Sequence, residues 1–233
     1  MKTTKDNLQI IYEDNHIIVI NKRAGDIVQG DKTGDKPLSE IVKSFLIEKY
    51  QKKGDAYLGV VHRLDRPTTG LVVFAKTSKV LPRLNSLFAD KNNVKKRYLA
   101  LVQKKDIPKK GTLTHWLTRN EKANKSKAHP NEVPNSKKAI LEYSILKELD
   151  NYNLLEINLL TGRHHQIRSQ LSALGCPIRG DIKYGAKRTN PDASISLHAY
   201  HLEFIHPVKK EKISLYAPIP ELVKPANIIL ETK

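Results

Sequence analysis

The residue with the clearest chemical potential is Asp65, a lone carboxylate in the segment HRLDRPTTG. Arg63 and Arg66 stand on either side of it, and nearby positive charge favours the ionised form of a carboxyl group. An ionised aspartate can act as a nucleophile, as a base or as a binding residue. Taken alone, however, the segment is more typical of a solvated hairpin tip whose charges serve solubility. The rest of the chain must decide between these interpretations.

A second dense cluster lies in the segment TGRHHQIR. We expect a helix near 163–174 with Thr161 as its cap, which places Arg163, His164 and His165 in its first turn. Positive charge at that end opposes the helix dipole, which favours anions there by about 0.3–1 kcal/mol per charge. A bound anion such as a nucleic-acid phosphate explains this arrangement, and a basic helix end exposed to water is the alternative.

Two further side chains could join a site with Asp65. Arg168 lies one turn beyond the basic cluster and could reach a carboxylate on a neighbouring strand. Tyr98 follows Lys96 and Arg97 in KKRYLALV. It could stack on a base, although the pattern favours packing in the core.

Other site chemistries find little support in the sequence. The nine histidines show no HExxH or comparable spacing, and the adjacent His164 and His165 point to different faces, so we expect no zinc site. No serine occupies a nucleophile elbow, and no glycine-rich nucleotide loop is present. GDKTGDK lacks the spacing of both a phosphate loop and a calcium loop.

The elements that must position these residues follow a mixed pattern. Apolar runs on both sides of Asp65 predict two short strands with the carboxylate between them. Polar, basic residues at 120–137 predict a long loop. Strands outnumber helices and several are hairpin neighbours, which predicts a mixed, largely antiparallel α+β domain. Strands are expected within 8–22 (two, joined by a turn at Asp14-Asn15), 94–103, 113–119, 139–147, 153–160, 194–205 and 212–217, and helices over 37–51, 77–91 and 163–174.

Charge is the strongest bulk property of the chain. Its 233 residues include 41 Lys and Arg against 24 Asp and Glu, a net charge of +17, which points to a polyanionic partner, nucleic acid above all. No apolar run is long enough for a membrane span, and MKTTKDNLQI is not a secretory signal. Cys176 is the only cysteine, so no internal disulfide is expected. We expect a cytoplasmic protein.

Five ordered segments resemble the RluA-type pseudouridine synthases, which isomerise specific uridines in RNA. They are YEDNHIIVINKRAGDIVQG, HRLDRPTTG, KKRYLALV, TGRHHQIRSQLSALGCPIRGDIKYG and SLHAYHLEFIHPV. Arg23 stands where that family usually has proline, Pro67 and Thr69 replace the commoner Asp and Ser, and His164 replaces a usual threonine. The likeness extends from about Ile10 to Pro218. Such order is far more specific than any single motif.

The resemblance implies a pseudouridine synthase fold, with a mixed, largely antiparallel central sheet and flanking helices and loops around an active-site cleft. It implies a single catalytic domain over residues 1–233, with no RNA-binding module ahead of it. We note only a possible hinge at 103–111. It further implies ribosomal or transfer RNA as the partner, no cofactor and no metal. We expect a monomer that does not associate with membranes.

The resemblance also assigns roles to the residues above. Asp65 would be the nucleophile or base, and Arg168 would pair with it and keep it ionised. Tyr98 would stack on the uracil, and Arg63 would help extrude the base or fill the space that it vacates. We expect RNA contacts from His62, Arg66, Lys96, Arg97, Arg163, His164, His165, Lys122, Lys125 and Lys127. The alternatives are a non-catalytic RNA-binding or ribosome-assembly protein on the same fold, and a metal-dependent nuclease or hydrolase, which would need more carboxylates than the one at Asp65.

Overall fold

The computed structural model describes residues 2–31, 33–90 and 93–223. The chain divides into two compact units, the first from residues 1–94 and 199–218, the second from 95–198 and 219–233. Two of the three divisions fall within the strands Val94–Gln103 and Leu197–Ile205, and the third follows Pro218. The segment 103–111, which we considered as a hinge, is not where the units part.

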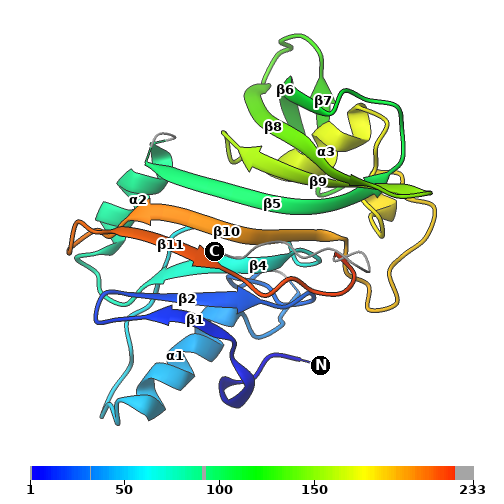
Figure 1. Ribbon diagram of the computed structural model, residues 1–233. Coiled ribbons are helices and arrows are strands. Elements are labelled where there is room, and N and C mark those ends of the chain that lie inside the picture. The colour runs from blue at the N-terminus through cyan, green and yellow to red at the C-terminus, as the bar shows by residue number, and fades with distance from the viewer. Residues whose placement is uncertain (1, 32, 91–92, 224–233) are drawn as a thin grey trace. The chain divides into compact units, whose positions relative to one another are not determined.

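The described residues of unit 1 form strand pairs together with the α-helices α1 and α2 (Figure 1). Strands β1 and β2 form the hairpin predicted for residues 8–22, and β2 and β3 both pair antiparallel with β4. Strands β10 and β11 form a second antiparallel pair. The bounds are η1 (Lys5–Asn7), β1 (Ile10–Glu13), β2 (Ile17–Lys22), α1 (Leu38–Lys49), β3 (Gly59–Val60), β4 (Thr69–Ala75), α2 (Leu81–Ala89), β10 (Leu197–Ile205) and β11 (Lys212–Tyr216).

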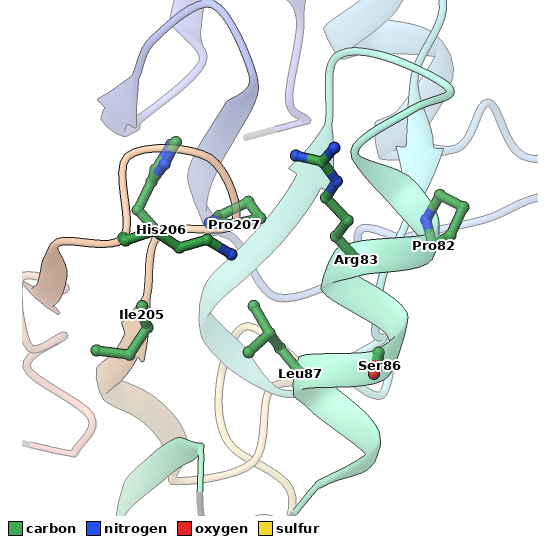
Figure 2. Close-up of a pocket in the computed structure, with 8 residues that line it drawn as sticks. Pro82, Arg83, Ser86, Leu87, Ile205, His206 and Pro207 are labelled. Carbon is green, nitrogen blue, oxygen red and sulfur yellow. The ribbon is translucent and has the colours of Figure 1, made fainter.

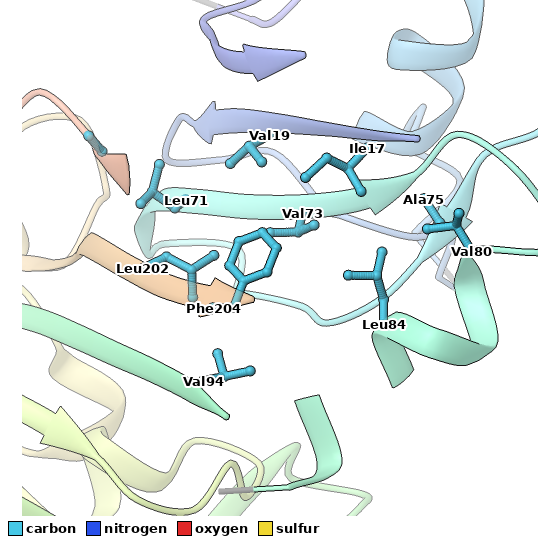
Figure 3. Packing of buried hydrophobic residues seen from close by; sticks show 11 residues of the cluster. Ile17, Val19, Leu71, Val73, Ala75, Val80, Leu84, Val94, Leu202 and Phe204 are labelled. Carbon is cyan, nitrogen blue, oxygen red and sulfur yellow. The ribbon is translucent and has the colours of Figure 1, made fainter. Parts of the chain in front are cut away.

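Alternation along β2 explains why unit 1 has a helix on each face of its strands. Ile17 and Val19 point to one face, where Leu84 of α2 packs with them (Figure 3). Ile18 points to the other face, where Leu46 of α1 packs. Each fully buried aliphatic side chain contributes roughly 1.5–3 kcal/mol, so the two clusters together hold β2 and β4 in place.

Over its described residues, unit 2 is an antiparallel sheet with one α-helix. Its strands pair in the order β5-β9-β8-β6-β7. Helix α3 packs against β6 and β7 and buries Ile167 and Leu171. It ends before Gly175, which has a φ of 82° suited to a helix stop, and Cys176 is buried just beyond it. The bounds are β5 (Val94–Gln103), β6 (Lys110–Asn120), β7 (Lys125–His129), β8 (Lys137–Glu148), β9 (Tyr152–Leu159), α3 (Gln166–Ala173) and η2 (Ile182–Tyr184).

The prediction of a long loop over residues 120–137 is wrong, because this segment contains β7. Asn120 accepts a hydrogen bond from the backbone N–H of Ala123, and Asn124 adopts a φ of 45°, so the chain reverses in a tight turn. Strand β7 then pairs with β6. Only Ser126 of the first three residues of β7 is buried, so the strand lacks the apolar alternation that sequence reading depends on.

Two helix starts also differ from prediction. Helix α3 begins at Gln166, after His165 in a left-handed conformation with a φ of 50°, so the basic cluster lies in the turn before the helix. Thr161 does not cap it but donates a hydrogen bond to the Gln166 side chain (2.8 Å). Helix α2 begins at Leu81, several residues later than expected, and its predicted end near 91 lies outside the described residues.

The other predicted elements are confirmed, and with them the largely antiparallel α+β class. Within the described ranges, no helix is long and apolar enough to cross a membrane.

Candidate active site

Asp65 lies in the connection between β3 and β4, as predicted, and is half-buried. The backbone N–H of Thr68 donates to the Asp65 carbonyl at 3.0 Å and closes a turn, which we call the aspartate turn (residues 65–68). Gly70 follows with a φ of 118°, and a Cβ there would lie 2.3 Å from the Ala199 carbonyl oxygen. Only glycine fits at that point. The aspartate turn therefore leads into a strand whose backbone packs closely against Ala199.

Lys22 supports the aspartate turn from inside the protein. It is 1% exposed, and its Nζ donates to the carbonyl oxygens of Arg23 (2.8 Å), Asp26 (2.8 Å) and Arg66 (3.1 Å). Burial lowers the pKa of Lys22 to about 7, and the carboxylates of Asp26 and Asp65 oppose that decrease. Lys22 is not among the residues predicted for the site. Its one signal is a lysine that closes the apolar run IIVIN.

Both the backbone and the side chain of Arg66 make polar contacts. Its carbonyl oxygen also accepts from the backbone N–H of Gly25 (2.9 Å). Its Nη2 lies 2.8 Å from the carboxylate of Asp35 and 2.9 Å from the hydroxyl of Thr33. Arg66 and Asp35 line a hollow of about 770 Å³ beside the N-terminal segment. The arginine that the sequence places beside Asp65 therefore pairs with an acidic loop, and its contact with RNA stays a prediction.

His62 has a structural contact within its hairpin. The backbone N–H of Val73 donates to its Nε2 (3.1 Å), and its ring stacks on Phe88 with 5.0 Å between centroids. These contacts fix the start of the aspartate segment against β4 and α2. Arg63, the next residue, is exposed.

In unit 2, Tyr98 lies on β5 opposite Ile157 of β9 and is 7% exposed. Lys96 is two positions away and so shares its strand face. Burial lowers the pKa of Lys96. Arg97 belongs to the opposite face, with its Nη1 4.0 Å from the Glu156 carboxylate.

Arg168 is buried in unit 2, where Asp181 holds it in a two-pronged ion pair. The Nε of Arg168 donates to Oδ2 of Asp181 (2.7 Å) and its Nη2 donates to Oδ1 (2.9 Å). The ring of Tyr184 lies against the guanidinium, 4.9 Å from its central carbon. Neither Asp181 nor Tyr184 is among the residues predicted for the site. Their one signal is an acidic residue inside an otherwise basic segment, IRGDIKYG.

The basic turn before α3 is fastened to the β6–β7 hairpin. His164 lies 2.9 Å from the Ser126 hydroxyl through its Nδ1 and 3.1 Å from the Asn124 side-chain oxygen through its Nε2. His165 is buried, with its Nδ1 2.9 Å from the Tyr184 hydroxyl. Both histidines thus have structural contacts, and their contact with RNA stays a prediction.

Exposed cationic side chains lie on and around the basic turn before α3. Arg163 is exposed and donates to a backbone carbonyl of β8. Lys122 lies in the turn of the β6–β7 hairpin, and Lys125 and Lys127 are exposed on β7. Lys125 also lies over the Tyr184 ring, 5.2 Å from its centroid. Together these side chains give the hairpin a cationic surface.

A separate hollow of about 460 Å³ lies in unit 1 between α2 and the β10–β11 turn. Figure 2 shows Arg83 and Leu87 on the helix side and His206 and Pro207 on the turn. None of the residues predicted for the site lines it. Over the described part of the chain, no group of three His, Cys, Asp or Glu residues gathers in a way that could hold a metal ion.

The chain matches the family model described as RNA pseudouridylate synthase over residues 16–173. It belongs to this family. The pseudouridine synthase is 34% identical over 92% of its length to "Uncharacterized RNA pseudouridine synthase YjbO" of Bacillus subtilis (strain 168), covering 73% of that relative. It is 33% identical over 92% of its length to "Ribosomal large subunit pseudouridine synthase D" of Zymomonas mobilis, covering 70% of that protein.

Solved structures agree on the fold of the synthase. The chain "Human RNA Pseudouridylate Synthase Domain Containing 4" superposes with a TM-score of 0.78 over 92% of this chain and 90% of its own, at 24% sequence identity. Membership of the family confirms the predicted activity class. The protein is an isomerase that acts on RNA.

Proposed function

We propose that this isomerase converts uridines of structured ribosomal RNA to pseudouridine, with Asp65 as the nucleophile or base. Relatives named as ribosomal large subunit pseudouridine synthases, 33% and 36% identical over more than nine-tenths of this chain, support ribosomal RNA as the substrate. The observation that carries the assignment of Asp65 is its turn, which Lys22 and Gly25 hold through the Arg66 carbonyl. Transfer RNA is the alternative substrate.

The reaction breaks the bond from ribose to the ring nitrogen of uracil, turns the ring and rejoins it through a ring carbon. That carbon releases a proton and the freed nitrogen takes one, so no atoms are gained or lost overall. An enzyme that works on this bond must first take the base out of its stack. A half-buried carboxylate on a fixed turn suits a nucleoside that arrives in a pocket.

The family resemblance supplies the remaining roles in this proposal. Arg168 pairs with Asp65 and keeps it ionised once water is excluded. Tyr98 stacks on the uracil. Arg63 takes the space of the extruded base. The whole chain works as a single catalytic domain.

Substrate RNA is held by the surplus cations in this proposal. The β6–β7 hairpin, the basic turn at Arg163 and the side chains of His62, Arg66, Lys96 and Arg97 supply the contacts. Phosphate contacts position the RNA, whereas the pocket selects the base. We further propose a cytoplasmic monomer that needs no metal.

The test maps pseudouridine in cellular RNA of a deletion strain complemented with wild type or with Asp65→Asn. Wild type should restore the lost site and Asp65→Asn should not, because the amide keeps the shape of the side chain but loses its charge. In an assay of the purified chain with ribosomal RNA and a chelator, the single-turnover rate of Asp65→Asn should be at least about 1,000-fold below that of wild type, as for removal of a catalytic group in other enzymes.

The matched control is Asp55→Asn, which makes the same change at an exposed aspartate of unit 1 and should behave as wild type. Restoration of the site by Asp65→Asn would refute the catalytic role. Rescue of growth by Asp65→Asn without pseudouridine would instead support the non-catalytic ribosome-assembly role on the same fold.

A further inference from the structure

We propose that Asp181 and Tyr184 are positioning residues of this isomerase, which hold the guanidinium of Arg168 in the orientation that the reaction requires. The inference rests on the role proposed above for Arg168. It assigns a task to two residues that do not touch the reacting atoms in that proposal.

Asp181 fixes the plane of the guanidinium. Two parallel hydrogen bonds, Nε to Oδ2 at 2.7 Å and Nη2 to Oδ1 at 2.9 Å, oppose rotation of the Arg168 guanidinium about its terminal bonds. The side chains are 5% and 1% exposed, so water does not compete with the pair. A planar, bidentate contact of this kind specifies a direction as well as a charge.

The backbone of Asp181 is itself held rigidly. Gly180 precedes it with a φ of 88°, and a Cβ at that position would lie 2.7 Å from the Ser194 carbonyl oxygen. The Asp181 amide donates to the Ile178 carbonyl, and its own carbonyl accepts from Ala186, both at 3.0 Å. The carboxylate is therefore a fixed anchor and not a mobile counter-ion.

Tyr184 supports the face of the guanidinium. Its ring lies 4.9 Å from the central carbon of Arg168, within the range of a cation–π contact. Its hydroxyl accepts from the Ser126 backbone N–H (2.8 Å) and can donate to Nδ1 of His165 (2.9 Å). Both ends of the tyrosine are thus engaged.

The contacts of Tyr184 also link Arg168 to the proposed RNA-contacting hairpin. Ser126 lies on β7 between the exposed Lys125 and Lys127. Its hydroxyl donates to the His164 carbonyl (2.8 Å) in the turn before α3. The hairpin that carries the cations and the arginine of the site therefore share one support.

A purely structural role explains this arrangement less well. A buried ion pair is weak evidence for stability, because apolar residues of similar volume often replace one without loss. What an apolar pair cannot supply is a guanidinium held in one orientation. Catalysis is sensitive to such orientation, and a displacement of about 1 Å can cost about 100-fold in rate.

The decisive variant is Asp181→Asn, assayed on the full chain with its RNA substrate under multiple-turnover conditions. The amide places an N–H group against the donors of Arg168, which should shift the guanidinium. We expect kcat to fall by about 10-fold to 100-fold while KM changes by less than about threefold. An unchanged kcat in the folded variant would overturn the proposal.

Tyr184 is tested by a pair of substitutions. Tyr184→Leu removes the ring from the face of Arg168 and should lower kcat about as far as Asp181→Asn does. Tyr184→Phe keeps the ring and loses only the hydroxyl, so it should recover most of the rate. Equal losses in both variants would contradict the positioning role of the ring. This pair decides alone if Asp181→Asn does not fold.

The matched control is Gln170→Met on the same helix. Gln170 is fully buried and donates to the carbonyls of Leu113 (3.0 Å) and Ala139 (3.3 Å), away from Arg168. This variant should lower the melting temperature but not kcat. A kcat that tracks melting temperature equally in Gln170→Met and Asp181→Asn would reduce Asp181 to a structural residue.

Arg168→Lys separates this inference from the function on which it rests. A fully active Arg168→Lys enzyme would refute the role proposed for Arg168. An inactive Arg168→Lys enzyme alongside fully active Asp181→Asn and Tyr184→Leu enzymes would refute only the positioning role. If Asp181 acts through Arg168, adding Asp181→Asn to Arg168→Lys should cost little further rate.

Discussion

The buried amino group of Lys22 donates hydrogen bonds to three backbone carbonyl oxygens. An ammonium group has three N–H donors, so the number of donors equals the number of acceptors. One of the acceptors belongs to Arg66, the residue that follows Asp65, and the carboxylate of Asp65 is close enough to act on the pKa of Lys22. The lysine therefore joins the end of β2 to the aspartate turn.

Replacing Lys22 with Met should both destabilise the protein and slow the reaction. Methionine fills a similar volume but leaves buried carbonyl groups without donors, and one such group costs about 1–3 kcal/mol. We expect a loss of about 3 kcal/mol in the free energy of unfolding, measured with urea, and a lower single-turnover rate because the turn loses its tether. Lys79→Met, at an exposed lysine of the same unit, should change neither. Equal stability and rate in the two variants would contradict this view of Lys22.

At this scale the sequence could identify Asp65 but not the residues that support it. Asp65 is the only carboxylate among several cations, and its neighbours in the chain already suggest its chemistry. Lys22 sits at the end of a strand, where a lysine ordinarily reaches water. Asp181 and Arg168 are 13 residues apart, so their pairing follows from the path of the chain after α3.

Among the elements, the β1–β2 hairpin carries two nearly buried carboxylates, Glu13 and Asp14. Burial raises the pKa of Glu13, but hydrogen bonds from Lys49, Lys76 and Tyr50 outweigh it and lower the pKa to about 2. For Asp14, burial is outweighed by the backbone amides that follow it and by cationic neighbours, and its pKa is also about 2. The turn of the hairpin thus depends on ionised carboxylates.

As the pH falls, the β1–β2 hairpin should lose stability before the hydrophobic clusters of unit 1 do. Both pKa values are lower in the folded protein than in the unfolded chain, so the stability that these groups contribute is present above about pH 4.5 and is lost as the pH falls towards 2. For Glu13 the contribution is about 2 to 3 kcal/mol. We expect Glu13→Gln to be less stable than wild type by this amount near neutral pH, as measured with urea.

The difference between Glu13→Gln and wild type should shrink to near zero at about pH 2, since protonation then removes from wild type the charge that the glutamine variant already lacks. Glu132→Gln, at an exposed glutamate, provides the control and should match wild type at every pH. A constant difference across the pH range would contradict the ionic account.

The β6–β7 hairpin shows where element prediction from sequence fails. Apolar, β-branched runs predict β2, β4 and β5, and the structure buries most of their residues. Strand β7 buries Ser126 and exposes the lysines on either side, so its alternation is polar against charged. Its position is set by hydrogen bonds to the turn before α3, which the local sequence does not encode.

For the molecule as a whole, a net charge of +17 makes RNA binding a matter of counter-ion release. Replacing Lys122, Lys125 and Lys127 with alanine should weaken RNA binding, and the slope of log affinity against log salt should become shallower. Each lost phosphate contact removes about 0.7–0.9 from the slope, so three contacts remove about 2 to 3. Filter binding over a range of salt concentrations measures this.

Total charge and local contact must be separated in that experiment. Alanine at Lys52, Lys53 and Lys79 removes the same number of charges from exposed positions of unit 1 and should leave the slope nearly unchanged. If both triple variants lose the same slope, binding responds to net charge and the hairpin has no special part. If neither changes, the hairpin does not contact RNA.

Cys176 gives the segment between Arg168 and Asp181 a built-in chemical reporter. It is the only cysteine of the chain, it is fully buried, and burial raises the pKa of its thiol. A thiol reagent can therefore modify the folded protein only when the end of α3 opens, because the reactive thiolate is otherwise both scarce and shielded. The rate at which Cys176 is alkylated therefore measures how often the end of α3 opens, and the wild-type chain needs no added label for this measurement.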